Sequence, residues 1–317
     1  MPFLFEDEIE ILVRDKTRKY MDEINSLKSD LSRREEKICE LQIVILEQKK
    51  NQKKAQSRIV NWTATGANDE MLKRKNVKEE ADLTKLEIFA TIDDEFQTTI
   101  IGNSFHISQN HSIHKEDFLN DLKSLPKSVA KYNSRGLGVE FGFSTLPGRG
   151  RSKTDCEYRN GICEPFLRTS TTHKSTQDFQ ANQLDRILKH MWEKLVETYP
   201  EKAQLALDKT PEKYRYTKNT GFSKITVALN NPTPFHYDKN NLKKSMTAIY
   251  IITDGECEGG EQVLEESGEA VVIKSHNGCL IIGDYTYFRH AVLPVLKGNR
   301  GVVIAYSMES ISQYSSK

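Results

Sequence analysis

The last third of the chain, from about Ser223 onward, alternates short apolar segments with tight turns. Dipeptides such as Asp254-Gly255 and Asn277-Gly278 are typical of turns that connect antiparallel strands. Many short strands of this kind bury their apolar sides well as two facing sheets, so we predict a double-stranded β-helix, or jelly roll. The candidate strands are Lys224–Leu229, Phe235–Asp238, Met246–Ile252, Glu261–Leu264, Ala270–Lys274, Cys279–Ile282, Ala291–Val295 and Gly301–Ser307.

An amphipathic helix is predicted ahead of these strands. Apolar residues recur at helical spacing over residues 177–199, and Pro200 follows them. The recurring residues are Leu184, Ile187, Leu188, Met191 and Leu195. We expect this face to pack against a sheet. The predicted fold class is therefore α+β: a jelly roll with supporting helices and an N-terminal coiled-coil helix.

The first 55 residues predict a coiled-coil helix. Residues 8–55 contain neither Pro nor Gly, and a heptad frame that starts at Val13 places apolar residues at most of its inner positions. Such a helix buries its seam against another helix, which indicates a homo-oligomer or a partner protein. The alternative is a long helix that folds back on the rest of its own chain.

Residues 56–82 are interpreted as a basic linker, and residues 83–317 as the jelly-roll domain. Between Lys49 and Lys78 there are nine basic and two acidic residues. Such a stretch can neutralise phosphates or direct nuclear import, although many basic stretches are only solvated.

The overall composition excludes several classes of protein. Lys and Arg number 46 and Asp and Glu 45, so net charge does not indicate a polyanionic partner. The five cysteines are odd in number and form no CxxC pair, which argues against a disulfide framework or a zinc site. The sequence shows neither a signal peptide nor an apolar run long enough to span a membrane. We expect an intracellular protein, nuclear or cytoplasmic.

A metal site is predicted within the strand-rich region. Side chains two residues apart on a strand point to the same face, so His236 and Asp238 can bind one ion together. His290 lies several strands later and can supply a third ligand. Two imidazoles and one carboxylate on one side of a metal form the facial triad of non-haem Fe(II) oxygenases.

Arg300 is the candidate cofactor-binding residue. It begins the last predicted strand, where Arg300, Val302 and Ile304 alternate toward the interior. A guanidinium in that place can hold the distal carboxylate of a dicarboxylic keto acid through two parallel hydrogen bonds. The alternative is an exposed arginine in a turn.

This combination resembles the 2-oxoglutarate/Fe(II) dioxygenase superfamily. The resemblance covers roughly residues 223–309 and includes the turns Gly259-Gly260-Glu261 and Gly283-Asp284. The segment His236-Tyr237-Asp238-Lys239-Asn240-Asn241 is similar to the TET/JBP branch, which oxidises the methyl group of 5-methylcytosine or thymine in nucleic acid. The resemblance implies Fe(II), 2-oxoglutarate and O2, with ascorbate as a further candidate cofactor. It also implies that Asn241 faces the target base; otherwise Asn241 satisfies the backbone of its own turn.

DNA is the expected substrate, and two further arginines are candidate substrate contacts. Arg149 and Arg151 lie in the Gly-rich segment Pro147–Lys153, which is either a phosphate-contacting flap or an ordinary surface loop. One alternative function is a 2-oxoglutarate-dependent hydroxylase of a protein side chain or small molecule. Another is a binding module that has lost its chemistry.

Overall fold

The computed structural model describes residues 20–21, 57–60, 83, 86–92, 98–101, 105–109, 115–128, 130–133, 136–145, 158–159, 162–266 and 268–314. The chain divides into two units, Met1–Gln56 and Ser57–Lys317. Within the first unit only Tyr20 and Met21 are described, and both are helical. The rest of the predicted coiled coil therefore lies outside the described residues, as do Arg149 and Arg151.

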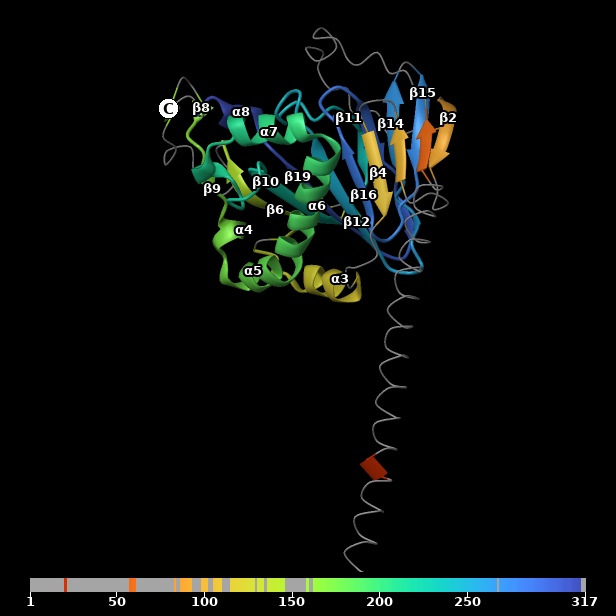
Figure 1. Cartoon of the computed structure of the whole chain (residues 1–317), viewed down its shortest axis with the longest axis horizontal. Coiled ribbons are helices and arrows are strands. Elements are labelled where there is room, and N and C mark those ends of the chain that lie inside the picture. Colours follow the sequence, from red (N-terminus) through yellow and green to blue (C-terminus); the bar gives the residue numbers. More distant parts are fainter. Residues whose placement is uncertain are drawn as a thin grey trace, which may run out of the picture. The chain divides into compact units, whose positions relative to one another are not determined.

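Two β-sheets build the second unit (Figure 1). The larger sheet follows the order β1 (Ser57–Val60), β3 (Thr98–Ile101), β4 (Phe105–Gln109), β16 (Cys279–Gly283), β12 (Thr247–Thr253), β19 (Arg300–Tyr306), β10 (Lys224–Leu229), β6 (Gly136–Ser144) and β5 (Lys131–Asn133), and β9 (Phe166–Leu167) pairs with β6. The smaller sheet follows the order β11 (Thr233–His236), β17 (Arg289–Val292), β14 (Gln262–Glu266), β15 (Glu269–Ile273) and β2 (Glu87–Ile92). Two further two-stranded sheets pair β13 (Glu258–Gly259) with β18 (Val295–Lys297) and β7 (Tyr158–Arg159) with β8 (Ile162–Cys163).

The C-terminal strands cross repeatedly between the two sheets, as in a jelly roll, and the consecutive strands β14 and β15 form a hairpin within the smaller sheet. Neighbouring strands of this region run antiparallel, while β1 with β3 and β2 with β15 are parallel. The two-sheet, strand-rich architecture that the turn pattern predicted is confirmed. Strand β1 lies within the stretch predicted as a basic linker, and its pairing with β3 adds those residues to the larger sheet.

Strand β12 shows how the core is divided. Ala248, Tyr250 and Ile252 belong to a cluster that includes the helices, whereas Ile249 and Ile251 belong to a cluster between the two sheets. Side chains alternate across a strand, so one apolar run supplies both layers. Every residue of β12 is buried, because the strand is covered on both faces.

Helices cover the outer face of the larger sheet (Figure 1). They are α3 (Lys115–Ser124), α4 (Thr169–Thr172), α5 (Lys174–Phe179), the π-helical segment η3 (Gln180–Leu184), α6 (Asp185–Thr198) and α7 (Pro200–Lys209), while the 3-10 turn η4 (Glu212–Tyr214) and α8 (Glu309–Ser312) come later. The helix predicted over residues 177–199 thus spans α5, η3 and α6. Its predicted apolar face is buried against the sheet, as expected. Pro200 begins α7, where its missing N–H needs no partner.

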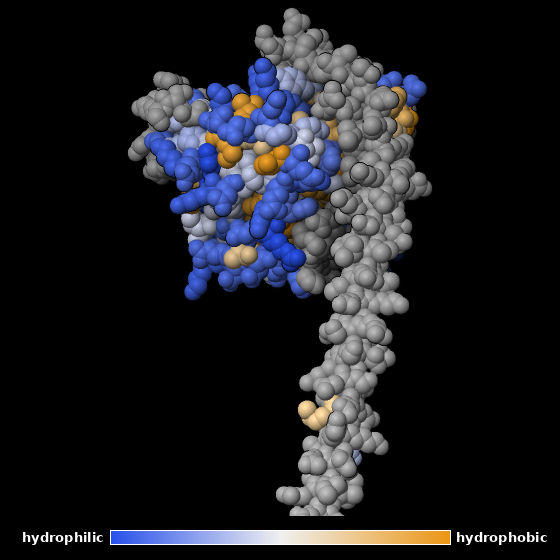
Figure 2. Space-filling model, in the orientation of Figure 1, coloured by the Kyte–Doolittle hydropathy of each residue, from blue (hydrophilic) through white to orange (hydrophobic). Residues whose placement is uncertain are grey.

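The outer surface of this helical layer is mostly hydrophilic, with scattered apolar side chains (Figure 2). This is the expected surface of amphipathic helices whose apolar faces are turned inward. Among the residues that the structure describes, no helix has the length and apolar character needed to cross a bilayer.

His106 on β4 gives a prediction about acid stability. Its side chain is buried, and neither ring nitrogen has a hydrogen-bond partner among the described residues. Burial, helped by the charge of Lys194 and opposed by Glu197, lowers the pKa of His106 to about 4. In the unfolded chain a histidine titrates near pH ~6.5. As the pH falls below this value, the unfolded chain therefore takes up a proton at His106 while the folded chain stays unprotonated there. The free energy of unfolding is therefore unaffected by His106 above pH ~6.5 and decreases as the pH falls toward 4.

We expect His106→Leu to remove this acid sensitivity. Between pH 7 and pH 4 the free energy of unfolding of the variant should fall by about 3 kcal/mol less than that of the wild type. Urea titrations at several pH values measure the difference. Parallel pH profiles for the two proteins would assign the acid sensitivity to other groups.

Candidate metal centre

Strand pairing brings the two predicted histidine ligands together. His236 is the last residue of β11, and it lies directly opposite His290 of β17 in the smaller sheet. Their ring centroids are 4.2 Å apart. The register slips between Thr233 and His236, so the end of β11 departs from a regular ladder at the site.

Hydrogen bonds leave the same nitrogen of each ring available. His236 Nδ1 donates to the carbonyl of Pro234 at 2.8 Å, and His290 Nδ1 donates to the carbonyl of Phe288 at 3.1 Å. A backbone acceptor at Nδ1 places the lone pair of a neutral imidazole on Nε2, the atom that can bind a metal. Burial and the neighbouring His236 lower the pKa of His290 to about 4, which keeps its ring neutral near pH 7.

Asp238 joins the histidines for a different reason from the one predicted. The sequence placed it on the strand of His236, but β11 ends at His236 and Asp238 lies in the following turn. Its backbone N–H donates to the carbonyl of Tyr285 at 3.0 Å. This contact brings Asp238 Oδ1 within 3.6 Å of His236 Nε2 and 3.9 Å of His290 Nε2.

The three side chains have the donor set of a facial triad. One ligand atom from each lies within 4.8 Å of the others, and no other such group of His, Cys, Asp or Glu occurs among the described residues. Burial raises the pKa of Asp238, but the neighbouring His236, His290 and Asn241 lower it more, so the carboxylate is ionised. Burial lowers the pKa of His236, but Asp238 and the carbonyl of Pro234 raise it more, so this ring loses its Nε2 proton when a metal binds. Two imidazoles and one carboxylate are a donor set that fits Fe(II).

Arg300 points into the interior from the first residue of β19. It is 3% exposed, and its Nε donates to Ser275 Oγ at 2.8 Å. None of the ion pairs within the described residues includes Arg300. Burial lowers the pKa of Arg300 to about 10, so the guanidinium remains charged near pH 7. A buried cation without a carboxylate partner indicates a site for an anionic ligand.

Tyr285 connects the metal site with Arg300. Its ring packs edge-on against His290 at 4.7 Å between centroids, and its hydroxyl accepts a hydrogen bond from Gln262 Nε2 at 2.8 Å. Burial raises its pKa, and the charges of Asp238 and Arg300 act on it in opposite directions. Tyr285 therefore contacts the metal-site histidine directly and lies within the electrostatic influence of both Asp238 and Arg300.

No family model matches the sequence, and no curated protein matches it either. Among solved structures, the chain is similar to NgTET1 in complex with 5mC DNA. The TM-score is 0.52 at 9% identity, and the match covers 68% of this chain and 78% of that one. The chain therefore shares its fold with this structure. The chain has a weaker similarity to an oxidoreductase of the 2OG-Fe(II) oxygenase family from Burkholderia pseudomallei, with a TM-score of 0.39 at 10% identity over 64% of this chain and 84% of that one. For OsALKBH1 the TM-score is 0.40 at 11% identity, over 66% of this chain and 99% of that one.

Within this fold, the predicted substrate residues have different positions. Asn241 is 6% exposed, and its amide nitrogen donates to Asp238 Oδ2 and to Thr247 Oγ1. It therefore contacts the metal-site carboxylate, where the resemblance implied that it would face a base. Arg149 and Arg151 lie outside the described residues.

Several residues of the site were not predicted. Ser275, Gln262 and Thr247 contact Arg300, Tyr285 and Asn241 through strand register, which no local motif reveals. Gly260 has a signal in the sequence, the Gly-Gly turn. Its φ of +71° favours glycine, and a Cβ there would lie 2.7 Å from Arg300 Cδ. The side chain of Arg300 occupies the space that Gly260 leaves open.

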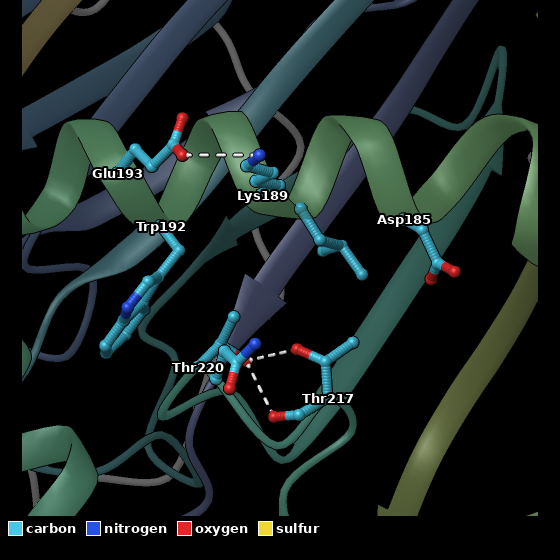
Figure 3. A pocket seen from close by; sticks show the side chains of 8 residues that line it. Asp185, Lys189, Trp192, Glu193, Thr217 and Thr220 are labelled. Atoms are coloured by element: carbon cyan, nitrogen blue, oxygen red, sulfur yellow. Dashed lines mark hydrogen bonds and ion pairs between the residues drawn. The ribbon is translucent and has the colours of Figure 1, made fainter.

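A separate cavity of about 350 Å³ lies beside α6 and the segment 217–220 (Figure 3). Its lining includes Trp192 but none of the metal-site residues. Lys189 pairs with Glu193 at 3.9 Å, and the hydroxyls of Thr217 and Thr220 are 2.9 Å apart. These polar groups satisfy one another, so we assign the cavity no ligand.

Proposed function

We propose that this protein is an Fe(II)- and 2-oxoglutarate-dependent dioxygenase that oxidises the methyl group of a 5-methylpyrimidine, 5-methylcytosine or thymine, in DNA. One observation carries the dioxygenase part: two imidazoles and a carboxylate converge in the same fold as a buried guanidinium that has no carboxylate partner among the described residues. The likeness to a structure that contains 5mC DNA supports the choice of substrate.

The residues of the chain have distinct tasks in this proposal. His236 Nε2, His290 Nε2 and Asp238 Oδ1 would hold the metal, while the carbonyls of Pro234 and Phe288 fix the two rings. Iron and 2-oxoglutarate, when bound, supply with O2 the oxidation of a substrate C–H bond, and 2-oxoglutarate leaves as succinate and CO2.

Arg300 would bind the distal carboxylate of 2-oxoglutarate. Ser275 accepts from its Nε and so orients the guanidinium plane, which leaves the terminal nitrogens to form a two-bond contact with a carboxylate. The apolar residues between the sheets, among them Phe105, Ile251 and Val302, exclude water from the space around these polar groups.

A base within a duplex cannot reach a metal between two sheets, so the target nucleotide would have to flip out of the helix. The basic stretch Lys49–Lys78 and the arginines Arg149 and Arg151 are proposed to contact the phosphate backbone. A second candidate function is hydroxylation of a protein side chain or small molecule. It is favoured by Asn241, the predicted base contact, whose amide nitrogen is already bonded to Asp238 and Thr247.

The deciding experiment incubates the full chain with Fe(II), 2-oxoglutarate and duplex DNA that contains 5-methylcytosine, and compares unmethylated DNA. We expect hydroxymethylated nucleosides by mass spectrometry, succinate in matching amount, and DNA binding that weakens steeply with added salt. Iron-dependent succinate without any nucleoside product, from cytosine-methylated or thymine-containing DNA, would favour the second candidate. Absence of iron-dependent succinate with any substrate would contradict the dioxygenase proposal.

A further inference from the structure

The turn after β11 folds Asn241 back onto the metal-site carboxylate. The backbone N–H of Asn241 donates to the carbonyl of Asp238 at 3.0 Å. The side-chain Nδ2 lies 3.1 Å from Asp238 Oδ2 and 2.9 Å from Thr247 Oγ1. Asn241 therefore contacts Asp238 through both its main chain and its side chain.

The chemistry of the partners decides which way this amide points. An ionised carboxylate only accepts hydrogen bonds, so the amide nitrogen and not the oxygen must face Asp238. The NH2 group has two hydrogens, and the structure gives it two acceptors, Asp238 Oδ2 and Thr247 Oγ1. Both donor positions of the amide are thus in use.

The two oxygens of Asp238 are consequently not equivalent. Oδ1 faces the Nε2 atoms of both histidines, and Oδ2 is held by Asn241. Rotation of an aspartate carboxylate about its last torsion is soft, because that torsion has a broad, roughly two-fold profile. A hydrogen bond to one oxygen restricts this rotation and keeps the other oxygen directed at the histidines.

The turn itself is fastened to the segment that follows β19. Asn241 and Met308 form an isolated β-bridge, Leu242 N–H donates to the carbonyl of Ser307 at 2.8 Å, and Glu309 N–H donates to the carbonyl of Asn240 at 3.0 Å. These bonds flank Asn241 on both sides. The amide is therefore attached to the larger sheet through its C-terminal strand, while the histidines lie on the smaller sheet.

We propose that Asn241 is a positioning residue of the metal centre, which holds Asp238 Oδ2 so that Oδ1 is presented to the metal; this inference rests on the proposed function. It replaces the base-facing role that the family resemblance implied. A base contact would act on substrate binding alone, whereas a positioning residue acts on the metal before any substrate is present.

The test measures metal binding by the full chain, with Asn241→Ala as the main variant. Calorimetry with Fe(II) under nitrogen and absorption spectroscopy with Co(II) report affinity and coordination without turnover. We expect Asn241→Ala to weaken metal binding about 10- to 100-fold, the range found for groups that orient a metal ligand. Hydroxylation and uncoupled 2-oxoglutarate consumption should fall together.

Thr247→Val is the matched control, because it removes the other acceptor of the same amide and leaves the bond to Asp238 in place. We expect this variant to keep metal affinity within about three-fold of the wild type, well inside the loss expected for Asn241→Ala. Asn241→Leu, which keeps the side-chain size, guards against a simple packing defect. All three variants are compared with the wild type by thermal unfolding without metal.

Three results would overturn the inference. Metal affinity in Asn241→Ala and Asn241→Leu equal to that of the wild type would refute it and leave the proposed function intact. Loss of base hydroxylation with full uncoupled 2-oxoglutarate consumption would restore the base-facing role. A wild-type protein that binds neither Fe(II) nor Co(II) would instead refute the proposed function, and this inference with it.

Discussion

Replacing Asp238 with alanine is expected to abolish metal binding and turnover together. Asp238 is the one anionic member of the triad, and its Oδ1 lies within 4 Å of both Nε2 atoms. Two neutral imidazoles alone would bind Fe(II) weakly and leave its charge uncompensated. The loss of affinity should exceed about 100-fold, the upper range for residues that only orient a ligand. Calorimetry with Fe(II) and succinate production measure the two effects.

Two companion variants make this result specific. Asp238→Asn keeps the size of the side chain but removes its charge, so it should lose the metal as Asp238→Ala does. Glu265→Gln removes a nearby carboxylate that pairs with Arg289 at 3.2 Å, outside the triad, and should bind metal normally. Metal should raise the melting temperature of the wild type and of Glu265→Gln only. Full turnover by Asp238→Ala would rule out the site.

The strands of the jelly roll could be predicted because their pattern is local. Lys224–Leu229 was predicted with the bounds that β10 has, since four of its six residues are apolar and the turn-forming Asn230-Asn231-Pro232 follows them. The prediction over Ala291–Val295 was wrong: β17 ends at Val292, β18 begins at Val295, and the two belong to different sheets. Pro294 lies between them and cannot donate to a ladder, a signal that the apolar run concealed.

The candidate site was predictable only in part, because its geometry depends on contacts between segments that are distant in the sequence. The spacing of His236 and Asp238 correctly indicated that they converge, but not how, because the contact between Asp238 N–H and the carbonyl of Tyr285 depends on strand packing. The direction of the Asn241 side chain depends likewise on its bridge to Met308. Residue type and spacing identify which groups can bind a metal, whereas long-range register decides which groups support them.

Arg300→Met is expected to remove most of the affinity for 2-oxoglutarate and to leave metal binding in place. The guanidinium is buried, carries its charge near pH 7, and lies outside every ion pair of the described residues. Removing one partner of a buried charge pair costs about 2 to 5 kcal/mol, which corresponds to about a 30- to 5,000-fold weaker Kd for 2-oxoglutarate. Calorimetry with the metal-loaded protein and the KM for 2-oxoglutarate measure this loss.

Further variants separate the charge of Arg300 from its geometry. Arg300→Lys keeps the charge without the two-pronged guanidinium and should fall between the wild type and Arg300→Met. Gly260→Ala introduces a Cβ 2.7 Å from Arg300 Cδ and should weaken 2-oxoglutarate binding with the charge intact. Arg300→Met should unfold without ligands at the wild-type temperature or above it, because it replaces a buried cation with an apolar side chain. Unchanged affinity for 2-oxoglutarate in Arg300→Met would mean that Arg300 is structural and that the keto acid, if bound at all, is held elsewhere.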